Sequence, residues 1–159
     1  MTEVELKIND CNWHVQLRDE ADISVFNEIF KLHEYRIADE VIEQAVHPIV
    51  DVGAHAGFFS MHARSLNKKV KILAVEPEPE NIKALEQHVR DNNISGVTVV
   101  KAALGLSSGS GKLIVTPDSH NHRLALGFED HETLVPVTVL SFADLLAQQK
   151  ITNVSLLKM

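Results

Sequence analysis

The strongest constraint on the fold is a regular alternation of short apolar segments with amphipathic ones after residue 47. Three apolar segments are predicted strands, at residues 48–53, 71–76 and 97–104. Two segments with apolar residues at helical spacing are predicted helices, at residues 58–66 and 79–92. Such alternation is typical of a parallel sheet with helices on both faces. We therefore expect an α/β, Rossmann-like domain over residues 47–159.

Residues 1–46 are predicted to form a separate N-terminal attachment. Apolar and polar residues alternate over 4–8 and again over 13–17, with a turn at Asn9 between them, which indicates a β-hairpin. A helix is expected next, capped by Asp22 or Ser24. A second short helix is predicted over 38–45.

After Leu104 the strand–helix rhythm changes. We predict strands at 112–116 and 135–140 with a loop at 117–132 between them. A helix over 142–149, capped by Ser141, and a final strand at 153–159 complete the chain. A domain that ends on an apolar strand is unusual, so we expect the sequence to be a piece of a longer domain, or to pair with a second copy through this edge.

Composition excludes several classes of function. The chain has 159 residues, a net charge of −7 and one cysteine. This acidity argues against nucleic-acid binding, and a lone cysteine suits a reducing compartment. No apolar stretch approaches the roughly 20 residues that span a bilayer, and the acidic start is unlike a signal peptide. We expect a soluble, cytoplasmic domain with no membrane partner.

The segment DVGAHAGFFS is the clearest candidate for a binding site. Asp51 ends a predicted strand, and Gly53 and Gly57 flank a tight turn into a helix. Glycines let a ligand approach the main chain, and the following helix presents unpaired N–H groups. Glu76 ends the next predicted strand, where an acid commonly accepts hydrogen bonds from ribose hydroxyls. The pattern predicts a nucleoside-containing ligand.

The spacing of the glycines distinguishes between such ligands. A dinucleotide fingerprint is GxGxxG, whereas this chain has DxGxxxG. A carboxylate at Asp51 would repel a diphosphate and suits an ammonium group. S-adenosylmethionine has both an amino-acid end and a ribose, so it is the favoured cofactor. An NAD-type oxidoreductase, or a non-catalytic nucleoside-binding or interaction fragment, remains as an alternative.

Several motifs in order resemble the FkbM family of S-adenosylmethionine-dependent methyltransferases: DVGAHAGFFS, AVEPEPENIKAL, VPVTVLSFADLL and VSLLKM. The resemblance implies a seven-stranded sheet and O-methylation of a small molecule or glycan hydroxyl. The cofactor-binding residues that it implies, on the methionine, ribose and adenine sides in turn, are Asp51, Gly53, Ala54, His55 and Gly57, then Glu76, then Pro77, Glu78, Ala102 and Ala103.

The sequence departs from the family at two points. His55 stands where the family often has Asn. The family also continues after a strand like VSLLKM with an acidic segment, so the catalytic residues are expected beyond Met159 and none is assigned here.

Each candidate also has a purely structural interpretation. Asp51 can cap the turn, the glycines can serve packing, and Glu76 can head a helix. Side chains of metal-ligating type cluster in the predicted loop, at Asp118, His120, His122, Asp130 and His131. In so polar a loop we interpret them as solvated, and no metal site is expected.

Overall fold

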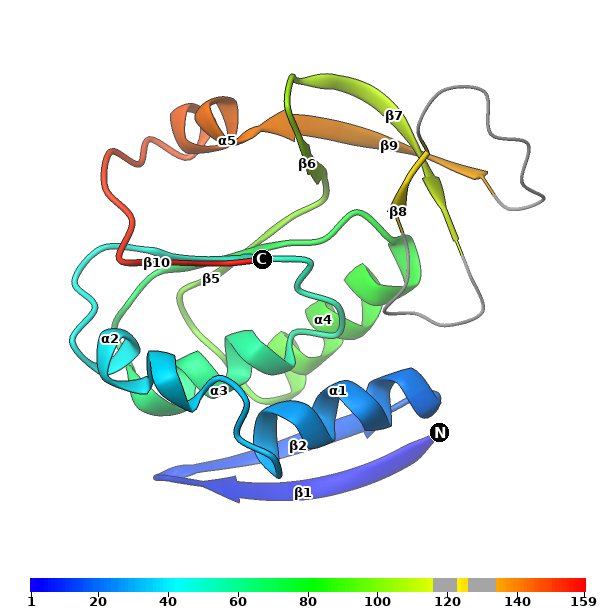
Figure 1. Cartoon of the computed structure of the whole chain (residues 1–159). Coiled ribbons are helices and arrows are strands. Elements are labelled where there is room, and N and C mark those ends of the chain that lie inside the picture. Colours follow the sequence, from blue (N-terminus) through cyan, green and yellow to red (C-terminus); the bar gives the residue numbers. More distant parts are fainter. Residues whose placement is uncertain (116–122, 126–133) are drawn as a thin grey trace.

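The computed structural model describes residues 1–115, 123–125 and 134–159. At its centre is a four-stranded parallel sheet in the order β10-β3-β4-β5. Its strands are β3 (Ile49–Val52), β4 (Ile72–Val75), β5 (Val97–Val100) and β10 (Leu156–Lys158). Figure 1 shows this sheet between a helical layer and a second sheet. The resemblance implied seven strands, and the described residues contribute four to this sheet.

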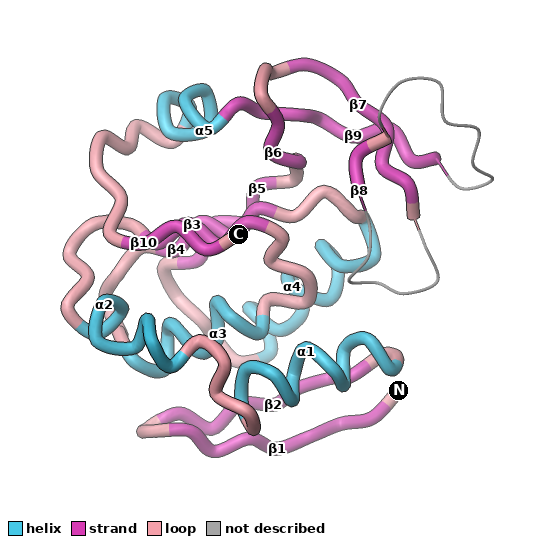
Figure 2. Tube along the Cα trace, viewed as in Figure 1, coloured by secondary structure: helices cyan, strands magenta, loops and turns pink. Residues whose placement is uncertain are grey.

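Helices cover both faces of the parallel sheet, as expected (Figure 2). On one face lie α3 (Phe58–Leu66) and α4 (Pro79–Asp91), and on the other lies α5 (Phe142–Gln148). Successive strand residues point to opposite faces. Ile49 therefore joins a core with Phe58, and Val50 joins a second core with Leu145. The predicted α/β class is confirmed.

The strand order creates a switch point between β3 and β10. The chain leaves β3 toward β4 and β5 on one side, and later returns to place β10 on the other side. In open α/β sheets, ligands bind outside the carboxyl ends of the strands at such a point. The carboxyl ends of β3, β4 and β10 are therefore the expected place for a ligand.

The N-terminal region packs beneath the helical layer. It contains the hairpin β1 (Thr2–Ile8) and β2 (Cys11–Leu17), followed by α1 (Glu20–Phe30). Trp13 and Phe26 belong to the same hydrophobic core as Phe58 of α3. The attachment and the sheet domain share a core, and the proposed boundary at residue 46 stays a prediction.

Two helix predictions in this region were wrong in detail. Asp19, not Asp22 or Ser24, caps α1, because its carboxylate accepts the N–H of Asp22 at 2.8 Å. Asp22 is fully buried and pairs with Arg18 instead. The single helix expected over 38–45 is a 3₁₀ turn, η1 (Arg36–Ala38), followed by α2 (Asp39–Glu43).

A second, mixed sheet lies above the first in the order β6-β9-β7-β8. Its strands are β6 (Ala103–Gly105), β7 (Gly109–Ile114), β8 (Arg123–Leu124) and β9 (Leu134–Ser141).

This second sheet corrects two predictions. The strand expected over 97–104 breaks, because Ala102 turns back to donate its N–H to Val100 at 3.0 Å and β6 then pairs with β9. The loop expected over 117–132 contains β8, which pairs with β7. The histidine and aspartate cluster of that loop lies outside the described residues.

Candidate functional site

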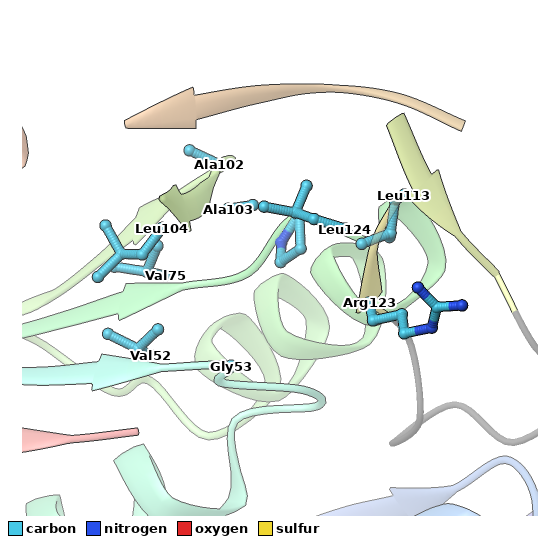
Figure 3. Close-up of a pocket in the computed structure, with 10 residues that line it drawn as sticks. Val52, Gly53, Val75, Ala102, Ala103, Leu104, Leu113, Arg123 and Leu124 are labelled. Carbon is cyan, nitrogen blue, oxygen red and sulfur yellow. The ribbon is translucent and has the colours of Figure 1, made fainter. Parts of the chain in front are cut away.

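A cavity of about 240 Å³ opens where the carboxyl ends of β3 and β4 face the second sheet. Figure 3 shows its wall, which is mostly apolar. The lining residues are Val52, Gly53, Val75, Pro77, Ala102, Ala103, Leu104, Leu113, Arg123 and Leu124. Four of the predicted cofactor-binding residues, Gly53, Pro77, Ala102 and Ala103, are therefore brought to one cavity. Its apolar walls suit a flat, weakly polar group such as a nucleobase.

The turn after β3 has the open geometry expected of a binding turn. The N–H groups of Gly53 and Ala54 both donate to the carbonyl of Val75, at 2.9 and 3.1 Å. Gly53 has φ +67°, and a Cβ placed there would have no atom within 4 Å. At Gly57, with φ +89°, a Cβ would lie 3.1 Å from Leu85 Cγ. Gly53 thus leaves space for a ligand, whereas Gly57 permits close packing of α4.

Glu76 follows β4 and closes the turn from the other side. Its carboxylate accepts the N–H of His55 at 2.8 Å and the N–H of Glu78 at 3.0 Å. Burial raises the pKa of Glu76, although these two hydrogen bonds oppose the shift. A carboxylate has about four acceptor positions. The Asn81 side-chain amide also donates to Oε1, at 3.5 Å, so these three donors leave about one acceptor position for a ligand hydroxyl.

Glu78, expected beside an adenine, has a structural role in this protein. Its carboxylate accepts the N–H of Asn81 at 2.6 Å and caps the first turn of α4.

Asp51 is held by two side chains rather than by the turn. It is fully buried, and Ser60 of α3 donates its hydroxyl to Oδ2 at 2.8 Å. The ammonium of Lys158, from β10, lies 3.1 Å from Oδ1. Burial alone would lower the pKa of Lys158, but the Asp51 carboxylate raises it above its ordinary value.

His55 links the turn to the N-terminal region. It has φ +52°, and its Nε2 lies 3.4 Å from Asp22 Oδ1. Asp22 is in turn held by the Arg18 guanidinium, which also lies 2.8 Å from Asn81 Oδ1. The His55 side chain therefore points away from the cavity wall and toward α1.

His88 joins the turn to strand β2 of the N-terminal hairpin. Its Nε2 accepts the N–H of Gln16 at 2.9 Å, so Nδ1 carries the proton that is donated to the Ala56 carbonyl at 2.8 Å. Burial lowers the pKa of His88, which suits this neutral ring.

Comparison with known proteins gives the family. A model of the methyltransferase FkbM domain matches residues 51–159, more than half of the chain. The chain belongs to the FkbM methyltransferase family. The expected family is confirmed.

The similar proteins are longer than this chain, and each matches it over less than half of its own length. Methyltransferase sdnD of Sordaria araneosa is 37% identical over 93 residues, which cover 58% of this chain and 34% of that protein. The chain thus spans about a third of that relative's length. Methyltransferase FkbM from Methylobacillus flagellatus KT is 17% identical with a TM-score of 0.42, covering 80% of this chain and 35% of that one. TYW2 of M. jannaschii, solved in complex with AdoMet, is 16% identical with a TM-score of 0.39, covering 62% and 42%.

The described part of the chain contains neither a membrane-spanning helix nor a cluster of metal-ligating side chains. Within residues 1–115, 123–125 and 134–159, no helix is long and apolar enough to cross a membrane. Over the same residues, no group of three or more His, Cys, Asp or Glu side chains is arranged to hold a metal ion.

Sequence reasoning missed Lys158 and the upper wall of the cavity. Leu113 and Leu124 reach the cavity from the second sheet, whose pairing is not visible in the local pattern. Lys158 did leave a signal, because it is the one charged residue in the final segment, SLLKM.

Proposed function

We propose that this chain supplies the cofactor-binding part of an S-adenosylmethionine-dependent methyltransferase. The observation that carries the proposal is the open, left-handed turn at Gly53, hydrogen-bonded to the end of β4 beside the buried Glu76 carboxylate. The cofactor supplies the methyl group. The residues of this chain bind and orient it.

The residues present fit this cofactor. Glu76 has acceptor capacity left for a ribose hydroxyl, and the apolar wall that includes Val75, Ala102 and Leu113 suits the adenine. The space beside Gly53, which a Cβ would otherwise fill, admits the group that follows the ribose. The cavity of about 240 Å³ lies below the roughly 300–1,000 Å³ of pockets that bury a drug-sized ligand. It therefore holds the nucleoside, with the amino-acid end extending along the turn.

We further propose a hydroxyl oxygen of a small molecule or glycan as the methyl acceptor. This part is carried over from the family and concerns the whole enzyme, of which the matched relatives are much longer. No catalytic residue is assigned to the described part of the chain.

Calorimetric titration tests the cofactor. We expect S-adenosylhomocysteine to bind, and NAD to bind about tenfold more weakly or worse, because the DxGxxxG turn lacks the GxGxxG pattern that holds a diphosphate. Tighter binding of NAD would favour an oxidoreductase, and binding of neither ligand would favour an interaction fragment.

A further inference from the structure

Lys158 places a cation at the switch point of the sheet. Its ammonium lies 3.1 Å from Asp51 Oδ1, 3.1 Å from the Gly53 carbonyl and 3.4 Å from the Val52 carbonyl. It also lies 5.8 Å from the centre of the Phe59 ring. Because Val52 and Gly53 line the cavity, this ammonium lies directly against the turn proposed to bind the cofactor.

Asp51 is not placed to receive a ligand itself. It is completely buried, and one of its oxygens takes the Ser60 hydroxyl while the other faces Lys158. The Lys158 side chain is 15% exposed. A group that approaches this end of the turn therefore meets the ammonium of Lys158 rather than the carboxylate of Asp51.

The site residues follow one another along the edge of the sheet in the order of the cofactor's own parts. Ala102 lies after β5, Glu76 after β4, Gly53 after β3, and Lys158 on β10. Neighbouring strands are about 4.8 Å apart. Adenine at Ala102 and ribose at Glu76 therefore direct the amino-acid end of the cofactor past Gly53 toward Lys158. The complement of an ammonium there is the carboxylate of that amino acid.

We propose that Lys158 binds the carboxylate of the cofactor's amino-acid end, and that Asp51 is a positioning residue that holds Lys158 in place. The proposal rests on the proposed function. An ammonium has three N–H donors. The bond to Val52, at 3.4 Å, is the longest and is the one that a ligand carboxylate would replace. The proposal departs from the expectation that Asp51 itself meets the ligand's ammonium.

Two ligands that differ in the amino acid test the proposal. S-adenosylhomocysteine has the carboxylate, and 5′-methylthioadenosine has the same nucleoside without it. In calorimetric titrations, Lys158→Met is expected to weaken S-adenosylhomocysteine binding about 10- to 100-fold and leave 5′-methylthioadenosine binding unchanged. Lys158→Arg, which keeps the charge, is expected to retain most of the affinity.

A second variant guards against misfolding. Lys158→Met leaves Asp51 buried without its cation, so the double variant Asp51→Asn with Lys158→Met removes both charges together. It is expected to show the same selective loss, with 5′-methylthioadenosine binding as evidence of an intact nucleoside site.

Three results overturn the proposal while the proposed function stands. These are unchanged S-adenosylhomocysteine affinity in both variants, an equal loss for both ligands, and tighter S-adenosylhomocysteine binding, which would mean that Lys158 occupies the place of the ligand's ammonium. If the unchanged protein binds neither ligand, the proposed function itself fails.

Discussion

Two buried carboxylates lie near the carboxyl ends of neighbouring strands of the same sheet, and the protein compensates their charges in different ways. Glu76 is held by main-chain N–H groups of His55 and Glu78. Asp51 is held by side chains, the hydroxyl of Ser60 and the ammonium of Lys158. The first arrangement is built locally by the turn and leaves acceptor capacity for a ligand. The second depends on a strand from the far end of the chain, and it places a cation beside the Gly53 turn.

The largest expected effect is on stability at the Asp51 side. Lys158→Met should lower the free energy of unfolding by about 3–5 kcal/mol, because it leaves a buried carboxylate without its cation. Urea denaturation measures this, and the double variant with Asp51→Asn should regain most of the loss. Lys83→Met is the matched control, because Lys83 is 70% exposed and its pair with Glu80 is screened by solvent. A loss below about 1 kcal/mol for Lys158→Met would show that Asp51 does not depend on this cation.

The next effect distinguishes the two carboxylates by ligand. Glu76→Ala should weaken binding of S-adenosylhomocysteine and of 5′-methylthioadenosine alike, by about 10- to 100-fold, because both contain the ribose. Calorimetric titration measures both affinities. Glu80→Ala changes an acid of α4 that is 69% exposed and should affect neither. If Glu76→Ala spared 5′-methylthioadenosine, the ribose would lie elsewhere and the two carboxylates would not divide the ligand as proposed.

The smallest effect concerns pH. Burial raises the pKa of Glu76 in the folded protein. Between the ordinary pKa of a glutamate and this raised value, the folded state holds more protons than the unfolded state. Its stability therefore falls as the pH rises through that window, by at most about 1.4 kcal/mol per pH unit. Subtracting the free energy of unfolding of Glu76→Gln at each pH isolates this slope, and a difference independent of pH would contradict it.

The same contrast explains how much of the site could be predicted. Gly53 and Glu76 could be identified because a strand, a turn and a helix are encoded by local periodicity, and both residues fall at predicted strand ends. Lys158 reaches Asp51 only through the parallel pairing of β10 with β3. No local pattern specifies that register.

The errors in the fold have similar causes. The segment 97–104 is rich enough in apolar residues to predict one strand, but its break at Ala102 follows from hydrogen bonds that both Ala102 and Glu76 make to Val100. Asp19, Asp22 and Ser24 all have cap chemistry, and the choice is decided by Arg18, which takes Asp22. Local preference limits the options in each case, and contacts from other elements make the selection.

Residues that precede the matched family segment form part of the hydrophobic core against which α3 packs. That segment begins at residue 51, yet Trp13 and Phe26 share a core with Phe58, and His88 bridges Gln16 to Ala56. A protein trimmed to the matched range would lack Trp13 and Phe26, so Phe58 would become more exposed to water. The turn after Gly53 would also lose its link to Gln16 through His88. The segment that the family model matches is therefore shorter than the segment that shares this hydrophobic core.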